Sequence, residues 1–174
     1  KNPRLILPYL IKSIKQLELA KADFIVLPCN TLHSLMPDLR KSSTIKFLDL
    51  IEEVSKEIKI NYKTIAILGT TKTKNSKLYN IALKNSNIKI IYPNRKQQQK
   101  VSQIILRIIR NKDSKKDKRY LNNLIKVLIK QGAEKVILAC TDLGNLIKNN
   151  KNALDTTDIL INSIVKEMKG GSKI

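Results

Sequence analysis

The sequence has no tryptophan, only two cysteines and one histidine among 174 residues, and 4% aromatic side chains. Two cysteines cannot build the dense disulfide framework of a small secreted domain. One histidine and two cysteines leave too few of the usual ligands for zinc, so we expect no metal. The lack of aromatic rings also removes the stacking surfaces that proteins use to bind single-stranded nucleic acid.

Long apolar runs and an opening signal segment are also missing. No apolar stretch reaches the roughly 18 residues of a membrane span, and no basic, apolar and small-residue sequence opens the chain. Two cysteines far apart in the sequence fit reduced thiols better than a disulfide. We therefore expect a cytoplasmic protein without membrane contact.

Acidic residues are scarce, since 14 Asp and Glu stand against 34 Lys and Arg, for a net charge of +20. Lys, Ile and Asn are abundant together along the whole chain, and only six of the basic residues are Arg. We interpret the charge as a bias of overall composition and expect no nucleic-acid partner, although a basic surface attracts acidic substrates. The densest basic cluster, at 110–119, contains acids and is predicted to be a solvated loop between two helices.

The chain contains an internal duplication. Residues 14–35 and 125–146 align without a gap at an offset of 111, and each copy carries one cysteine, Cys29 or Cys140. In each copy a helical pattern leads into a short apolar run, and the cysteine follows that run. Such a run predicts a buried parallel strand with the thiol at its carboxyl end, where α/β sheets bind ligands.

The similarity of the halves extends beyond the cysteines to a further strand and helix. We predict an α/β fold of two pseudo-symmetric lobes, each a parallel sheet flanked by helices. The predicted strands are 24–27, 44–49, 64–68, 88–92, 136–138 and 152–155, and helices are predicted at 50–58, 76–85 and 157–168.

The two lobes are predicted to be unequal. We assign residues 1–58 to a partial first lobe, completed by a C-terminal helix at 155–174, and residues 59–154 to the second lobe. Cys140 follows about 76 residues of its own half and Cys29 follows 28, so the first lobe is expected to be truncated by roughly 48 residues.

Three segments carry motifs that can be compared with known families. They are Asp23-Phe-Ile-Val-Leu-Pro-Cys29-Asn30-Thr31-Leu-His33, the Thr-rich loop from Leu68 to Tyr79, and Cys140-Thr141-Asp142. Together they resemble the aspartate/glutamate racemase family, and the aspartate racemases most closely. Hydantoin racemases, maleate isomerases and arylmalonate decarboxylases share this scaffold, but the decarboxylases have one cysteine and are therefore disfavoured.

The resemblance implies an isomerase that racemises an acidic amino acid, aspartate rather than glutamate, without pyridoxal phosphate or another cofactor. Stereoinversion needs a base on one face of the carbon and an acid on the other, and thiols serve in both roles. Cys29 and Cys140 are the candidate catalytic pair, with one proton between them in the productive state. The resemblance also implies a homodimer.

Other candidate site residues lie in the strand-end loops. Donors that would bind the substrate carboxylate and stabilise the carbanion are Asn30, Thr31, Thr70, Thr71, Thr73 and Thr141. Arg110 matches a family position that is usually Lys and contacts anionic groups of the substrate. His33 either orients the Cys29 thiol or makes a structural contact, and Asp142 is expected next to the Cys140 thiol.

Alternatives remain. The family's Gly-rich loop, and its Arg for the side-chain carboxylate, have no counterpart in this sequence. The chain is therefore also compatible with a catalytically inactive truncated remnant, or with a small-acid-binding protein of the same fold. A third hypothesis is a basic nucleic-acid-associated protein. Buried free cysteine commonly behaves as a small apolar residue, and Asp49 and Asp155 are predicted N-caps.

Overall fold

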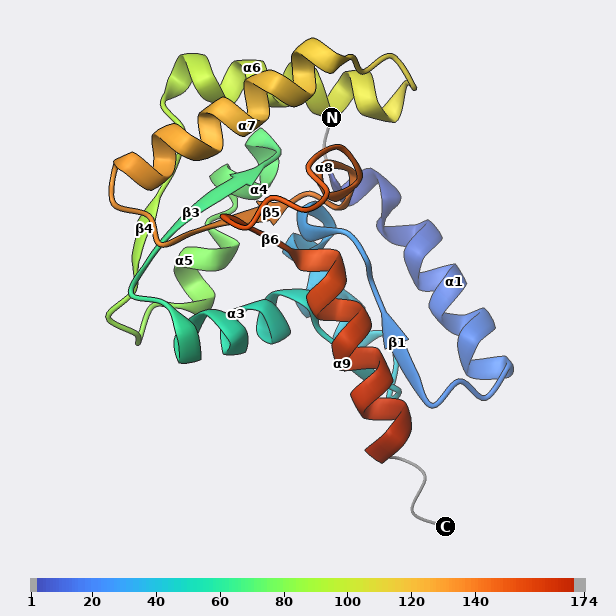
Figure 1. Ribbon diagram of the computed structural model, residues 1–174. Helices are drawn as coiled ribbons and strands as arrows, with labels where there is room; N and C mark the ends of the chain where they lie inside the picture. Colours follow the sequence, from blue (N-terminus) through green and yellow to red (C-terminus); the bar gives the residue numbers. More distant parts are fainter. Residues whose placement is uncertain (1–2, 171–174) are drawn as a thin grey trace.

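The structure is a computed structural model that describes residues 3–170 (Figure 1). No helix within these residues is long and apolar enough to cross a membrane. In chain order, with η for a 3-10 helix, the elements are η1 (Pro3–Ile6), α1 (Leu7–Leu19), β1 (Phe24–Val26), η2 (Asn30–Leu35), α2 (Met36–Lys41), β2 (Lys46–Leu48), α3 (Leu50–Asn61), β3 (Thr64–Gly69), α4 (Thr71–Asn75), α5 (Leu78–Ala82), β4 (Lys89–Ile91), α6 (Arg95–Ile109), α7 (Lys115–Lys130), β5 (Lys135–Ala139), α8 (Thr141–Leu146), β6 (Ala153–Asp155) and α9 (Thr156–Gly170).

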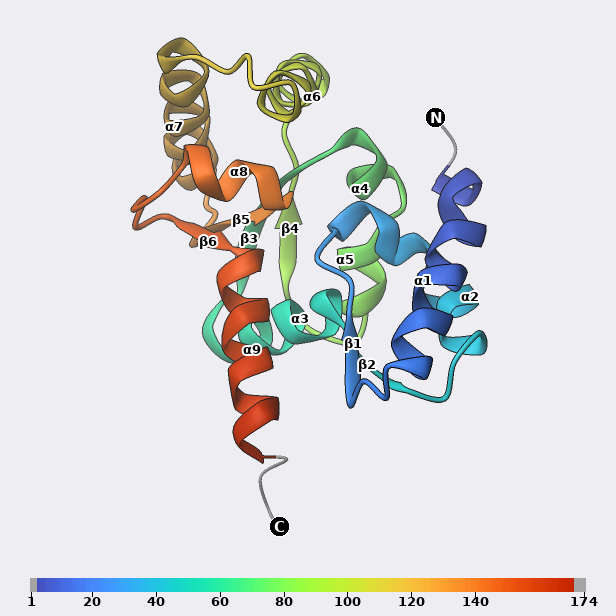
Figure 2. The same cartoon turned by 90° about the vertical axis from the view of Figure 1, so that its right-hand side faces the viewer.

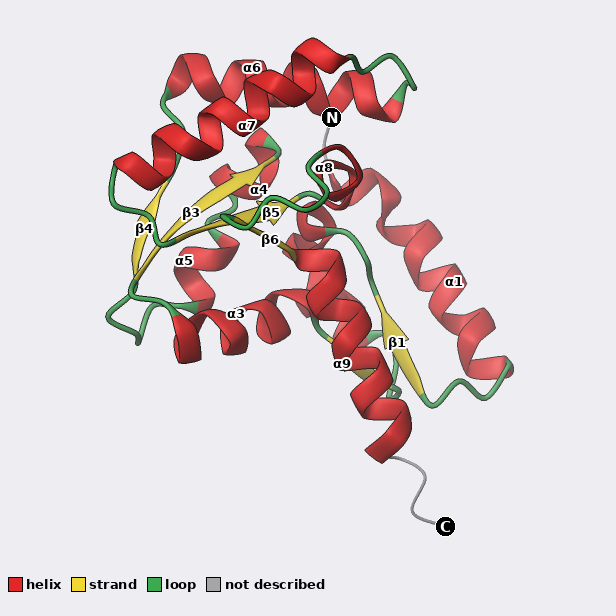
Figure 3. Ribbon diagram, in the orientation of Figure 1, coloured by secondary structure: helices red, strands yellow, loops and turns green. Residues whose placement is uncertain are grey.

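The strands form two parallel sheets, drawn in yellow in Figure 3. The smaller sheet pairs β1 with β2, and the larger has the order β4-β3-β5-β6. The pair β1–β2 repeats the pair β5–β6, because Val26 lies beside Leu48 just as its equivalent Ile137 lies beside Leu154. The predicted α/β fold with two parallel sheets flanked by helices is therefore confirmed. Within the described residues, the smaller sheet has no counterparts of β3 and β4.

Helices cover both faces of the larger sheet (Figures 1 and 2). The apolar sides of α6 and α7 pack on one face of β3 and β5. On the other face lie α3, α5 and α9, and α3 also packs against α9. The smaller sheet is covered by α1 and α2. Because α3 follows β2 in the chain yet packs against the larger sheet, one helical layer connects the two sheets.

The predicted division into lobes, 1–58 with the last helix and 59–154, stays a prediction. The helix expected at 155–174 is present as α9 up to Gly170, and residues 171–174 lie outside the described part. Asp49 is the N-cap of α3 as predicted, since its carboxylate accepts the N–H groups of Ile51 and Glu52.

The segment 110–119 differs from its prediction as a loop, because α7 begins at Lys115. Ser114 and Asp117 form a capping box, in which each side chain accepts the backbone N–H of the other. Asp117 is also paired with Arg107 of α6, which compensates its charge. The spacing Ser-x-x-Asp, which precedes an apolar pattern, was the sequence signal for this helix start.

The helix predicted around 76–85 is shorter than expected. The chain forms α4 and then α5, with Lys77 between them at a φ of +53°. That left-handed conformation interrupts a continuous α-helix. A turn therefore separates the Thr-rich loop from α5.

Candidate active site

The two cysteines occupy equivalent positions in the two halves. Cys29 follows β1 and precedes η2, and Cys140 follows β5 and precedes α8. Their backbones have nearly the same extended conformation, with φ and ψ of −151° and 105° at Cys29 and −154° and 121° at Cys140. Both thiols are free, and Cys29 is half-buried whereas Cys140 is buried. The predicted position of each thiol at a strand's carboxyl end is therefore observed.

Three threonines from two loops form a ring of hydroxyl groups. The Oγ1 of Thr31 lies 2.9 Å from that of Thr70 and 3.0 Å from that of Thr73, and Thr70 and Thr73 are 3.0 Å apart. The Thr73 N–H also donates to the Thr70 hydroxyl. The ring therefore joins the loop of Cys29 to the loop after β3, and brings together three of the predicted substrate ligands.

Asn30 is almost completely buried, and its side chain is bonded to other parts of the protein. Only 2% of its surface is exposed, and its amide oxygen accepts the Tyr79 hydroxyl at 2.6 Å. Its amide nitrogen donates to the Thr156 hydroxyl, which in turn donates to the carbonyl of Leu138 on β5. Burial raises the pKa of Tyr79, so the phenol stays neutral. This chain of bonds connects the Cys29 loop to the strand that carries Cys140, and leaves one amide N–H of Asn30 for a ligand.

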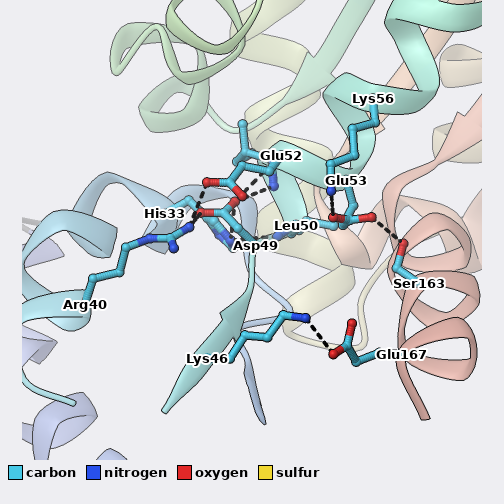
Figure 4. Close-up of polar contacts among 11 residues, drawn as sticks. His33, Arg40, Lys46, Asp49, Leu50, Glu52, Glu53, Lys56, Ser163 and Glu167 are labelled. Carbon is cyan, nitrogen blue, oxygen red and sulfur yellow. Dashed lines mark hydrogen bonds and ion pairs between the residues drawn. The ribbon is translucent and has the colours of Figure 1, made fainter. Parts of the chain in front are cut away.

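His33 contacts the main chain on both sides of its ring, and Figure 4 shows the side that faces Leu50 and Asp49. Its Nε2 accepts the backbone N–H of Leu50 at 3.2 Å, so the proton is on Nδ1, which donates to the carbonyl of Cys29 at 2.9 Å. Burial lowers the pKa of His33, and the neutral ring makes its 3.4 Å approach to Asp49 a contact without a full charge pair. Of the two predicted roles, these contacts favour the structural one, because they fix the Cys29 backbone.

A polar network surrounds this histidine, and the sequence analysis did not anticipate it. Arg40 donates to Asp49 at 3.0 Å and to Glu52 at 2.8 Å, so it ties α2 to the start of α3 (Figure 4). Farther along α3, Ser163 of α9 donates to Glu53. These bonds join α2 and α9 to α3, whose first N–H group donates to His33.

The surroundings of Cys140 differ from those of Cys29. Burial raises the pKa of the Cys140 thiol to about 12, against the effect of a hydrogen bond from the Asp142 backbone. The negative charges of the Asp142 carboxylate and of Cys29 add to the rise, and the thiol donates to the Asp142 carboxylate at 3.5 Å. Asp142 thus lies next to the thiol, and Cys140 is protonated at neutral pH.

The loop after β3 has a second contact that the sequence analysis missed. The Thr71 hydroxyl lies 2.8 Å from that of Ser102 on α6. Gln98, one turn earlier on α6, is buried and donates to the carbonyl of Gly69 at 2.9 Å. The N-terminal half of α6 therefore supports the Thr-rich loop, and Thr71 belongs to this support and not to the threonine ring.

Thr141 and Arg110 are not part of the threonine ring. Thr141 is half-buried and lines a hollow of about 780 Å³ with Asp142, Asp155 and residues of α9, and neither cysteine lines this hollow. Arg110 follows α6 directly and is exposed to solvent. Among residues 3–170, no group of three or more His, Cys, Asp or Glu side chains could bind a metal ion.

The arrangement offers a half-buried thiol at Cys29, a ring of hydroxyl groups that includes Thr31 two residues later, and a buried, protonated thiol at Cys140. Since thiols exchange protons and hydroxyl groups bind carboxylates, the site suits proton transfer next to a carboxylate.

Comparisons with known proteins place the chain among racemases. A family model described as Asp/Glu/Hydantoin racemase matches residues 2–164. The broad-specificity amino-acid racemase RacX of Bacillus subtilis (strain 168) is 30% identical over 149 residues, which are 86% of this chain. This chain spans 65% of the length of that racemase.

Solved structures give the same fold. An aspartate racemase homologue from Pyrococcus horikoshii OT3 is 26% identical, with a TM-score of 0.78, and the alignment covers 92% of this chain and 73% of the homologue. Picrophilus torridus aspartate racemase is 23% identical, with a TM-score of 0.79, and the alignment covers 92% of this chain and 68% of that one.

Proposed function

Since the chain belongs to the Asp/Glu/hydantoin racemase family, we propose that it racemises an acidic amino acid without a cofactor, by proton transfer between Cys29, Cys140 and the α-carbon. We propose aspartate ahead of glutamate, in line with the aspartate racemase homologue at 26% identity. The broad specificity named for the Bacillus subtilis relative makes a wider range of amino acids the competing proposal. We further propose a cytoplasmic homodimer.

One observation carries this proposal. The only two cysteines stand at equivalent strand ends of a duplicated unit, with nearly equal backbone conformations. A single buried cysteine would be explained by packing. Two thiols at equivalent strand ends, one of them in the loop that also carries Thr31 of the threonine ring, are better explained by a shared substrate.

The first step removes a proton. The Cys29 thiolate, as the more accessible sulfur, takes the α-proton from one face of the substrate, and a carbanion forms beside the carboxylate. The hydroxyl groups of Thr31, Thr70 and Thr73 turn from one another toward the carboxylate oxygens and stabilise the developing charge. The backbone N–H groups after each cysteine add further donors.

The second step returns a proton from the opposite face. The Cys140 thiol gives its proton to the carbanion and becomes a thiolate, while Cys29 keeps the proton it removed. For the other enantiomer the roles reverse, which requires a lower pKa at Cys140. The α-ammonium group of the substrate supplies the positive charge for this, because it neutralises Asp142 nearby. Arg110 and Thr141 stay candidates for the side-chain carboxylate.

Deuterium exchange tests the proposal. We expect the chain in D₂O to convert L-aspartate to D-aspartate with one deuterium at the α-carbon, followed by mass spectrometry and chiral chromatography. Cys29→Ala and Cys140→Ala should each lower racemisation by about 10²–10⁴-fold, the usual contribution of one acid or base. Racemisation that survives either substitution would contradict a two-thiol mechanism.

A small-acid-binding protein without activity is the second candidate. The pKa of about 12 at Cys140 favours it, because such a thiol is rarely ionised at neutral pH, and so does the absence of either cysteine from the 780 Å³ hollow. A folded sample that binds aspartate by calorimetry but incorporates no deuterium would establish this candidate in place of the racemase.

A further inference from the structure

The helices α6 and α7 form one layer whose outer side faces solvent. They lie side by side on the same face of the larger sheet in both Figures 1 and 2. Their inner sides pack on the sheet, where Ile104 and Ile125 are fully buried. Arg107 donates through Nε and a terminal nitrogen to the two carboxylate oxygens of Asp117, which joins the helices to each other. The two helices therefore form one layer, which we call the platform.

More than half of the exposed side chains of this platform are basic. From α6 and the residue after it come Arg95, Lys96, Lys100 and Arg110. From α7 come Lys115, Lys116, Lys118, Arg119, Lys126 and Lys130. With Lys112 of the connecting loop they make 11 exposed cationic residues, which we name the basic face, against one exposed acid, Asp113.

The excess of basic over acidic residues is much denser in residues 95–130 than in the rest of the chain. Residues 95–130 hold 12 Lys and Arg against two Asp, so 36 residues carry +10 of the net charge of +20. The other 138 residues hold 22 basic and 12 acidic residues. Four of the six arginines lie in the segment. A uniform compositional bias, as the sequence analysis assumed, would not place half of the charge in a fifth of the chain.

The charges of the basic face are not compensated within the described residues. Ion pairs elsewhere join basic side chains to acids, as in Arg40 with Glu52 and Lys46 with Glu167. In residues 95–130 only Arg107 has such a partner, and it is not one of the 11. The 11 cations therefore produce a positive electrostatic potential at this surface, and this potential attracts a polyanion.

We propose that the basic face binds the phosphate backbone of nucleic acid without sequence preference. The neutral exposed neighbours of the cations include Gln99, Gln103 and Asn123, whose amides are donors of the kind that contact phosphate oxygens. An anionic membrane would call for a gathered apolar surface as well. The exposed apolar side chains of the platform, Leu106, Ile109 and Val127, are few and split between the two helices. This inference does not depend on the racemase activity.

A matched pair of charge variants tests the proposal, with binding followed by fluorescence anisotropy of a labelled 25-base-pair DNA. One variant replaces Lys115, Lys116, Lys118 and Arg119 with Gln. The control replaces Lys12, Lys59, Lys84 and Lys89 with Gln, which are exposed, lie outside the basic face and change the net charge equally. Arg110 is left intact because it is a candidate site residue. Circular dichroism verifies the fold of both variants.

We expect the unaltered chain to bind DNA with an affinity that falls linearly with salt on a logarithmic scale, with a slope of about −4 to −5 for roughly five phosphate contacts. The first variant should lose at least tenfold in affinity at 100 mM salt and flatten the slope, and the control should lose less than threefold. Equal losses in both variants, or no binding at low salt, would overturn the proposal. The proposal would also be overturned, in favour of a membrane, if the first variant lost more affinity for phosphatidylglycerol vesicles than for DNA.

Discussion

The loops that follow Cys29 and Cys140 are copies of one segment, yet they are stabilised in different ways. Position 33 in the first copy corresponds to position 144 in the second, where the residues are His33 and Gly144. The His33 ring fills the space between its loop and the start of α3, beside Asp49. In the second copy Asp155, the equivalent of Asp49, occupies that space itself, so a Cβ at Gly144 would overlap its carboxylate.

This difference teaches how a duplicated unit diverges without moving its thiol. The Cys29 loop is fixed by a side chain that accepts one main-chain N–H and donates to the Cys29 carbonyl. The Cys140 loop is fixed by close packing of α8 on β6, and its thiol is buried next to Asp142. One loop therefore depends on hydrogen bonds and the other on the absence of a side chain.

Exchanging the residue between the copies should have the largest effect. Gly144→His places an imidazole where the Asp155 carboxylate lies, and we expect a loss of about 4 kcal/mol or more in the free energy of unfolding, at the upper end for overpacking. Chemical denaturation followed by circular dichroism measures it. As a control, Asn145→His changes an exposed neighbour on α8 and should cost less than about 0.5 kcal/mol. Equal stability of both variants would contradict the packing described for this loop.

Removing the histidine should come next. His33→Ala leaves the Leu50 N–H and the Cys29 carbonyl without their partners, at about 1–3 kcal/mol for each buried group. We expect a lower free energy of unfolding and a lower kcat, because the Cys29 backbone loses its support. His33→Asn, whose amide has a donor and an acceptor, should recover part of both. A histidine that only fills space would show no such recovery.

Alkylation should distinguish the two thiols themselves. At pH 8 a thiol of pKa about 12 is ionised in roughly one molecule in ten thousand, and the thiolate is the reactive form. We expect iodoacetamide to modify the half-buried Cys29 at least about 100-fold faster than Cys140, as read by peptide mass spectrometry.

Removing the carboxylate next to Cys140 should reduce the difference in alkylation rate between the two thiols. Asp142→Asn removes a negative charge that raises the pKa of Cys140, so its alkylation should accelerate several-fold while that of Cys29 stays unchanged. Asp158→Asn, an exposed acid of α9, is the matched control and should change neither rate. Indistinguishable rates for the two cysteines in the unaltered chain would refute the difference in their surroundings.

Stability at alkaline pH gives an independent measurement of the raised pKa at Cys140. Burial raises the pKa of Cys140 to about 12 in the folded chain, whereas an unfolded cysteine has a pKa of about 8.5. Between these values the folded chain keeps a proton that the unfolded chain releases, so the free energy of unfolding falls as pH rises. Between pH 8.5 and 10 this fall should amount to about 1.6 kcal/mol in the unaltered chain, and it should be absent in Cys140→Ala. The same slope in Cys140→Ala and Cys29→Ala would contradict the assignment.

Local pattern was enough to predict most of the fold. The short apolar runs before the cysteines predicted β1 and β5, and the internal similarity predicted the equivalent strands β2 and β6. Local signals that were overlooked account for part of the errors, such as the Ser114–Asp117 capping box that begins α7. The left-handed turn at Lys77, which shortens α5, has no such signal, because Lys adopts this conformation only where its surroundings impose it.

The candidate site was predictable in position but not in its contacts. Thr31, Thr70 and Thr73 were among six donors expected in strand-end loops, but Thr31 follows a strand of the smaller sheet and the other two follow β3 of the larger sheet. Their contact therefore depends on how the two sheets are placed together. The hydrogen bonds of Asn30 with Tyr79 and Thr156 join residues that are 49 and 126 positions apart, and no local pattern encodes such contacts. The roles of the candidate residues in binding and catalysis stay predictions.

What the sequence by itself determined is the duplicated architecture and the strand-end location of both sulfur atoms, because apolar periodicity and internal similarity are properties of neighbouring residues. Only the tertiary structure decided that His33 supports the backbone of Cys29, that Asp155 replaces it at Gly144, and that the basic segment 95–130 folds into one helical layer on the larger sheet. These features depend on which distant segments pack together, and the chain acquires them only when the helices dock on the two sheets.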